Sequence, residues 1–213
     1  MHGKHHFRFL SIPGGEPMIP PGLVEIGIRD IDWMYALEQA AQKNVEDEIL
    51  LAVQECCAQH DRWDGVYILS YFACLETSVL IDANDRVFID WGLPGSVHLQ
   101  QPVGAKIPFK LWVHTHPRMD TYWSMTDKNS LAFSTLLLQH AYVLGKQGVK
   151  STQNASLLNV EHDRSISNEA PLQFWSEEET EPWSRWYDAR KIEFQQQDSI
   201  ANICWLSSLN QSR

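Results

Sequence analysis

The sequence predicts one α/β domain with a β-sheet core and an additional segment at each end. Short apolar runs that are typical of strands alternate with segments of helical periodicity, which favours an α/β class. The chain of 213 residues is long enough for one sizeable core with extensions. It contains no internal repeat and no low-complexity tract.

The first predicted helices lie between residues 30 and 60, where apolar residues recur every three or four positions. Asp30 or Asp32 is a candidate cap for the first helix, and Asn44 is a candidate cap for the second. The next run, GVYILSYFACLE at residues 65–76, is apolar almost throughout. Its periodicity therefore does not distinguish a buried strand from a buried helix.

Strand patterns dominate the middle of the chain. Residues 77–92, TSVLIDANDRVFIDWG, predict two short strands joined by a turn around Asn84 and Asp85. A third strand is predicted at FKLWVH, residues 109–114. The remaining predicted elements are a helix within residues 125–141, strands at 141–149 and 155–162, and a helix at 182–197 with a proline in its first turn.

Composition and charge exclude several classes of function. Hydrophobic residues make up 44% and charged residues 21%, which is ordinary for a globular protein and too polar for a membrane protein. MHGKHHFRFL at the start lacks the apolar core of a signal peptide. The net charge of −10 argues against a nucleic-acid surface, which needs a surplus of Lys and Arg. The four cysteines show no framework spacing, so we expect a reducing, cytoplasmic location.

The densest group of chemically active residues is LWVHTHPRMDTYWSMTD, residues 111–127. Alternate residues of a strand point to the same face, so His114 and His116 at a strand end can direct both rings to one point. Asp127 can supply a third ligand if the loop at 117–123 folds back. Three protein ligands and a fourth position left for water are what a catalytic zinc site needs. The helical zinc motif and the deaminase Pro-Cys-x-x-Cys are both absent.

Each part of this motif also has a simpler interpretation. Ser124 followed by Asp127, just before an apolar run, is typical of the start of a helix. The two interpretations of Ser124 are compatible, because one serine can begin a helix and face a metal. Trp112 is expected on the face opposite the ligands, in the core, while Trp123 either packs in the core or lines a substrate groove.

The order His-x-His-Pro, a loop and Ser-x-x-Asp resembles the metal-binding signature of the JAMM (JAB1/MPN/Mov34) metalloproteases, His-x-His-x7-Ser-x-x-Asp. The resemblance covers roughly Glu76 to His140. It implies that His114, His116 and Asp127 ligate zinc and that Ser124 helps to polarise the substrate carbonyl.

The family fold implied by this resemblance is a mixed, mainly antiparallel β-sheet flanked by α-helices. We place this JAMM/MPN-like domain at residues 45–165. An N-terminal extension would then occupy residues 1–44, and a partly helical C-terminal extension would occupy residues 166–213.

The family also requires a glutamate at the start of a strand that neighbours the His strand. Glu76 is our candidate, because it immediately precedes a strand-like run and the hairpin after it matches the family's order of elements. The family usually has a helix just before this glutamate, where residues 65–76 allow either a helix or a strand. The rival residues, which lie in a helix-patterned segment and are expected to face solvent, are Glu46, Glu48 and Glu55.

The function implied by the resemblance is that of a zinc-dependent metalloprotease or isopeptidase. It would hydrolyse a peptide or isopeptide bond with metal-activated water, with Glu76 as general base and Ser124 on the oxyanion. The substrate would be a protein or peptide, such as a ubiquitin-like conjugate, and neither nucleic acid nor a membrane is an expected partner. Two alternatives remain: an inactive MPN-type binding scaffold, against which the intact ligand set argues, and a metallohydrolase of a small amide.

Overall fold

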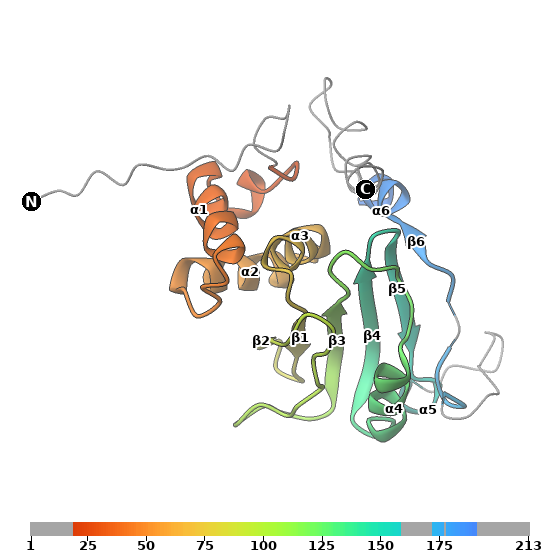
Figure 1. Ribbon diagram of the computed structural model, residues 1–213. Helices are drawn as coiled ribbons and strands as arrows, with labels where there is room; N and C mark the ends of the chain where they lie inside the picture. The colour runs from red at the N-terminus through yellow and green to blue at the C-terminus, as the bar shows by residue number, and fades with distance from the viewer. Residues whose placement is uncertain (1–18, 159–171, 177, 191–213) are drawn as a thin grey trace, which may run out of the picture.

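The protein is described by a computed structural model over residues 19–158, 172–176 and 178–190, with a six-stranded sheet at its centre (Figure 1). The order of strands across the sheet is β2-β1-β3-β4-β5-β6. Only β3 and β4 pair in parallel, and the other neighbours are antiparallel, so the predicted mixed, mainly antiparallel sheet is confirmed. The strands are β1 Thr77–Ile81, β2 Val87–Trp91, β3 Phe109–Thr115, β4 Leu138–Gly145, β5 Gly148–Gln153 and β6 Glu181–Pro182.

Six α-helices accompany the sheet in the described residues, after a short 3-10 helix at Val24–Ile26. In Figure 1, α1, α2 and α3 lie together near one end of the strands, and α4 and α5 lie near the other. None of the helices in the described ranges is long and apolar enough to cross a membrane. The helices are α1 Asp30–Ala41, α2 Glu48–Gln59, α3 Trp63–Ala73, α4 Met125–Phe133, α5 Ala155–Leu158 and α6 Trp183–Ala189.

The two faces of the sheet bury different hydrophobic clusters, because alternate residues of β3 point to opposite sides. Val113 packs in the larger cluster with residues of α1, α2, α3 and α6. Trp112 packs in the smaller cluster with Leu131 of α4 and with Trp175. The domain boundary predicted after residue 44 lies between α1 and α2, which both contribute to the larger cluster.

Residues 65–73 of the apolar run at 65–76 belong to a helix, α3. Every residue from Trp63 to Tyr71 is buried, so this helix is apolar on all sides, which explains why it has no amphipathic periodicity. It ends at Cys74, whose φ of 53° lies in the left-handed region. The last helical residue of α3, Ala73, therefore lies three positions before Glu76.

The predicted helix caps were wrong. α2 begins after Asp47, whose Oδ1 accepts hydrogen bonds from the N–H groups of Ile49 at 2.9 Å and Leu50 at 3.0 Å, so Asn44 is not the cap. At α1 the N-cap is Arg29, which makes no side-chain capping hydrogen bond.

Three later predictions need correction. The predicted strand at 155–162 begins as helix α5, and residues 159–162 lie outside the described residues. Asn154 accounts for the helix, because its Oδ1 accepts a hydrogen bond from the Ser156 N–H at 3.0 Å, as an N-cap does. The predicted helix at 125–141 stops at Phe133, and its last residues belong to β4. The predicted strand at 141–149 is instead the end of β4, a turn and the start of β5.

The predicted C-terminal helix at 182–197 is confirmed only for its first half, since α6 spans Trp183–Ala189 and Arg190 is its C-cap. Pro182 is the N-cap of α6, and the helix runs through Ala189. The residues after 190 lie outside the described part of the chain.

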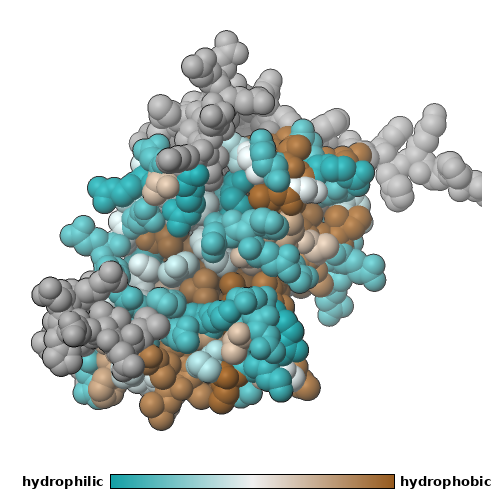
Figure 2. Space-filling view, turned by 180° about the vertical axis from the view of Figure 1, so that it is seen from behind, coloured by the Kyte–Doolittle hydropathy of each residue, from teal (hydrophilic) through white to brown (hydrophobic). Residues whose placement is uncertain are grey.

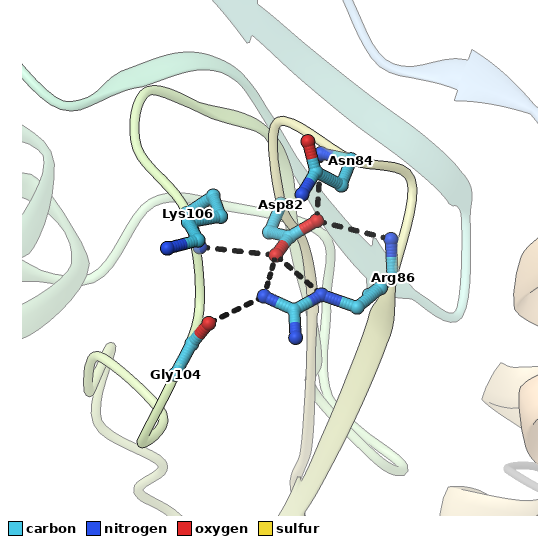
Figure 3. A network of polar contacts seen from close by, with 5 residues as sticks. All are labelled: Asp82, Asn84, Arg86, Gly104 and Lys106. Atoms are coloured by element: carbon cyan, nitrogen blue, oxygen red, sulfur yellow. Dashed lines mark hydrogen bonds and ion pairs between the residues drawn. The ribbon is translucent and has the colours of Figure 1, made fainter.

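The turn between β1 and β2 lies around Asn84 and Asp85, as predicted, and a buried carboxylate organises it (Figure 3). Asp82 accepts hydrogen bonds from the backbone N–H groups of Asn84 at 2.8 Å and Lys106 at 3.0 Å, and from the guanidinium of Arg86 at 2.6 Å. Burial raises the pKa of Asp82, but these hydrogen bonds outweigh burial and hold the pKa well below its usual range. Asp82 thereby fixes the long connection between β2 and β3 against the hairpin.

Apolar side chains gather along the lower edge of the molecule in Figure 2, the end at which α4 and α5 lie in Figure 1. Within α4 and in the three residues after it, the exposed large hydrophobic residues are Met125, Phe133 and Leu136. The core cluster on this face therefore leaves much of the outer surface of α4 uncovered by the described residues.

Candidate metal centre

The two histidines lie at the carboxyl end of β3 with both side chains buried. His114 is opposite Ser78 in the antiparallel pairing of β3 with β1. His116 follows two residues later, so both rings face the same side of the sheet, and their centroids are 5.0 Å apart. The strand thus brings together the two imidazoles that the sequence predicted.

Asp127 completes the group because the chain after His116 folds back into α4. The carboxylate lies in the first turn of α4, with Oδ1 3.2 Å from His114 Nε2 and Oδ2 3.5 Å from His116 Nε2. One ligand atom from each of the three residues fits within 4.8 Å of the others. The predicted ligands therefore meet at one buried point.

Ser124 and Asp127 also form the capping box that their spacing predicted. The N–H of Asp127 donates to Ser124 Oγ at 3.2 Å, and the N–H of Ser124 donates to Asp127 Oδ2 at 2.7 Å. This reciprocal pair fixes the start of α4 and the direction of the carboxylate. The capping role and the ligand role of Asp127 are compatible in this geometry.

The protonation states at this point suit a metal ion. Burial raises the pKa of Asp127, but His114 and His116 outweigh it and hold the pKa well below its usual range. Burial lowers the pKa of His114, which favours a neutral ring. An ionised carboxylate beside a neutral imidazole is the state in which these groups bind metals.

The donor set and its spacing also fit. Both ring nitrogens of His114 and the Nδ1 of His116 are buried without a hydrogen-bond partner among the described residues. His114 Nε2 faces Asp127 Oδ1 at 3.2 Å, and His116 Nε2 faces Asp127 Oδ2 at 3.5 Å, so each imidazole meets a different oxygen of the carboxylate. One ligand atom from each residue lies within 4.8 Å of the others. Two imidazoles and one carboxylate suit zinc and other divalent transition metals, so this group could hold a metal ion.

Glu76 lies beside the three possible ligands but is not one of the group. It is only 4% exposed and precedes β1, where its N–H donates to Leu93 O at 3.1 Å. In the antiparallel pairing of β1 with β3, Ser78 lies opposite His114. Two residues further along, the same register places Glu76 opposite His116. Burial raises the pKa of Glu76 to about 7; His116 opposes this rise, and the charge of Asp127 adds to it.

The rival glutamates are placed as expected. Glu46, Glu48 and Glu55 are all exposed on or near α2. Glu76 is the one of these four glutamates whose carboxylate is electrostatically coupled to the site.

Aromatic rings surround the histidines, and here one prediction was wrong. Trp112 is in the core, as expected, but it lies on the ligand face and stacks on His114 with centroids 4.6 Å apart. The strand period of two should have placed residues 112, 114 and 116 on one face. Trp123 is half-buried against His114 at 5.7 Å, and the ring of the exposed Tyr122 lies 5.0 Å from that of His116.

Sequence reasoning missed a chain of hydroxyl groups on the opposite face. Thr115 lies between the two histidines, and its Oγ1 accepts a hydrogen bond from the Thr77 N–H at 2.8 Å. Ser70 Oγ lies 2.5 Å from Thr115 Oγ1 and donates to Leu75 O at 2.5 Å. Because Ser70 uses its hydrogen on Leu75, Thr115 donates to Ser70. The sequence His-Thr-His could have predicted this, because alternate residues of a strand point to opposite faces and Thr115 must then face away from the histidines, toward α3.

Comparisons with protein-family models, with curated proteins and with solved structures find no match for this chain. The resemblance to the JAMM metalloproteases therefore rests on the motif residues, and it stays a prediction.

Proposed function

We propose that the protein is a zinc-dependent hydrolase of peptide or isopeptide bonds. The observation that carries the proposal is the meeting of His114, His116 and Asp127 at one buried point, with the carboxylate of Glu76 beside them. The spacing of these residues resembles the JAMM signature, which supports a protein or peptide substrate such as a ubiquitin-like conjugate.

Zinc held by His114, His116 and Asp127 would lower the pKa of a bound water from 15.7 to about 7. Glu76 would take a proton from the attacking water and deliver it to the leaving amine. A buried carboxylate beside the ligands suits this exchange, because it can accept a proton from the water and return it to the leaving amine. The helix α4 fixes Asp127, and the pairing of β1 with β3 fixes Glu76 relative to His116.

Ser124 would donate a hydrogen bond to the oxyanion that develops on the substrate carbonyl. Its Oγ accepts the Asp127 N–H through a lone pair, so the capping bond does not use the hydroxyl hydrogen. The side chain is half-buried at the start of α4, next to the ligand Asp127. A single donor of this kind typically stabilises a transition state by about 3–4 kcal/mol.

Glu76→Gln tests the proposal most directly, because it keeps the shape of the side chain and removes the basic carboxylate. We expect the variant to fold, to bind one equivalent of zinc and to lose nearly all hydrolysis. Zinc content by elemental analysis and turnover of a panel of peptides and ubiquitin-like conjugates would be measured on one preparation. Glu55→Gln is the matched control, since Glu55 is an exposed glutamate of α2, and it should leave both values unchanged.

Three results would contradict parts of the proposal. Substantial hydrolysis by zinc-loaded Glu76→Gln would remove Glu76 as the base. Loss of zinc from that variant would make Glu76 a ligand. A wild-type protein that binds zinc and cleaves no member of the panel would favour a binding scaffold.

A further inference from the structure

We propose that Trp112, itself held by Ser78, is a positioning residue that fixes the direction in which the His114 ring presents Nε2. This inference rests on the proposed metal-binding function and concerns how the chain itself prepares one ligand. Three observations support it: the stacking of the Trp112 ring on the His114 ring, the buried hydrogen bond from Trp112 to Ser78, and the absence of a hydrogen-bond partner for His114 Nδ1 among the described residues.

The ring of Trp112 lies flat against the ring of His114. The two centroids are 4.6 Å apart and the planes are inclined by 18°, and both residues are fully buried. The other rings near His114 are farther away and more steeply inclined: His116 at 5.0 Å and 66°, and Trp123 at 5.7 Å and 44°. Among these neighbours, Trp112 therefore restricts most directly the rotation of the His114 ring about its Cβ–Cγ bond.

The indole is itself fixed by β1. Trp112 Nε1 donates a hydrogen bond to Ser78 Oγ at 2.9 Å, and the donor and acceptor are both buried. Ser78 is the cross-strand partner of His114, so Trp112 reaches diagonally across the pair on the same face of the sheet. The residue beside Trp112 on β4 is the small Ala141, which leaves space for the indole in the smaller core cluster.

His114 lacks the support that metal-binding histidines ordinarily have. Such a histidine usually donates its second ring N–H to a carboxylate or a carbonyl, which orients the ring. The Nδ1 of His114 has no hydrogen-bond partner among the described residues. Because the second torsion of a histidine side chain has a broad energy profile, packing must set the ring direction here. The stacked indole supplies that packing and keeps Nε2 3.2 Å from Asp127 Oδ1.

Ser78→Ala tests the proposal with the smallest change, because it removes the acceptor of the indole N–H and neither of the two rings. We expect its zinc affinity, measured by competition with a chromophoric chelator, to fall about 10-fold, the lower end of the effect of outer-shell partners. Ser78→Thr keeps the hydroxyl and should restore most of the affinity. If Ser78→Ala folds poorly, Trp112→Phe takes its place as the test. It keeps an aromatic ring and removes the N–H, so we expect the same loss of zinc affinity.

A matched control separates positioning from a general loss of stability. Thr152 is a buried residue of β5 whose hydroxyl donates to Ser176 O at 2.6 Å. Thr152→Val removes a buried hydroxyl from the same sheet, so it should lower the thermal midpoint and leave zinc affinity unchanged. NMR of the metal-free protein gives a second measurement, because the Trp112 ring current shifts the His114 ring protons in the wild type and should shift them less in Ser78→Ala.

The outcomes for this inference and for the proposed hydrolysis are distinct, since none of these measurements uses turnover. Wild-type zinc affinity in Ser78→Ala, with or without a changed His114 resonance, would overturn the inference. An equal loss of affinity in Thr152→Val would also overturn it, because the effect would then follow stability alone. A wild-type protein that binds zinc without hydrolysing any substrate would contradict only the proposed function.

Discussion

At the scale of single residues, Asp127 combines the role of a helix cap with that of a candidate metal ligand. Its Oδ2 accepts the Ser124 N–H at 2.7 Å while its Oδ1 faces His114 Nε2 at 3.2 Å. The helix α4 cannot begin at another residue without moving the carboxylate away from the histidines. The local signal for a helix start and the signal for a metal site are therefore carried by the same side chain.

Ser124→Ala should separate the capping role of Ser124 from its catalytic role. The substitution removes the acceptor of the Asp127 N–H, so we expect a loss of about 1 kcal/mol in the free energy of unfolding. It also removes the oxyanion donor, so turnover should fall by roughly 10²–10³ while zinc content stays complete. Urea unfolding, elemental analysis and steady-state kinetics would measure the three effects.

Asp47→Ala is the control for this experiment. Asp47 caps α2 through two backbone hydrogen bonds, also accepts the Tyr35 hydroxyl, and takes no part in the candidate metal centre, so its loss should cost at least as much stability and leave turnover unchanged. If Ser124→Ala were to lower stability alone, as Asp47→Ala does, only the capping role of Ser124 would remain.

Glu76 should make the stability of the metal-free protein depend on pH. Burial raises its pKa from 4.5 to about 7, so the folded state holds this proton more tightly than the unfolded state does. The resulting stabilisation is complete below about pH 4.5 and is lost as the pH rises through 7. Glu76→Gln removes this loss, so at pH 8 the metal-free variant should exceed the wild type by as much as about 3 kcal/mol. Urea unfolding of both proteins at pH 4.5 and pH 8 measures the difference; equal stabilities at pH 8 would contradict the raised pKa.

At the scale of elements, the site depends on where α3, β1 and β3 end. The hydroxyl of Thr115 joins these elements, because it accepts the Thr77 N–H and donates to Ser70 near the end of α3. Thr115 lies between the two histidines of β3, and Thr77 follows Glu76. The chain of hydroxyls therefore fixes Glu76 relative to His114 and His116 from the opposite face of the sheet.

Thr115→Val should disturb this junction without changing the volume of the side chain. It leaves the buried Thr77 N–H without its acceptor, so the free energy of unfolding should fall by about 1–3 kcal/mol. We also expect lower turnover, because Glu76 and His116 are no longer held in register. Thr115→Ser keeps the hydroxyl and should retain turnover. Thermal unfolding and kinetics of both variants test this, and full turnover in Thr115→Val would show that the strand pairing alone fixes the base.

The elements also show which features the sequence could predict. The hairpin around Asn84 and the His-x-His strand follow from local patterns, and both were predicted. The run at residues 65–76 was ambiguous because α3 is buried on all sides, so it has no polar face to reveal its period. The start of α5 was missed because it depends on Asn154, whose Nδ2 donates to Leu138 O at 3.0 Å while its Oδ1 caps the helix.

At the scale of the whole molecule, the two faces of the sheet have different tasks. The larger hydrophobic cluster packs α1, α2, α3 and α6 on one face, and the candidate metal ligands lie on the other face with α4. The C-terminal helix α6 is part of the first face, since its Trp186 and Tyr187 pack in that cluster. No local sequence pattern predicts this docking, because it joins residues more than a hundred positions apart.

The docking of α6 includes a buried polar contact. Asp64 at the start of α3 pairs with Arg62 at 2.7 Å and accepts the hydroxyl of Tyr187 at 2.7 Å. All three residues are buried. A hydrogen bond to a buried charged group typically contributes about 1.5–3 kcal/mol.

Tyr187→Phe should therefore lower the free energy of unfolding by about 1.5–3 kcal/mol, because Asp64 loses a buried donor. Tyr35→Phe is the matched control: Tyr35 also donates to an aspartate, Asp47, but at 3.2 Å and from a half-buried position, so its loss should cost under about 1 kcal/mol. Both variants should keep full zinc content, since α6 and α1 pack on the face of the sheet opposite the ligands. Urea unfolding and elemental analysis of the two variants check both expectations. A loss of zinc from Tyr187→Phe alone would mean that the two faces are coupled, and that docking of the C-terminal helix helps to shape the metal centre.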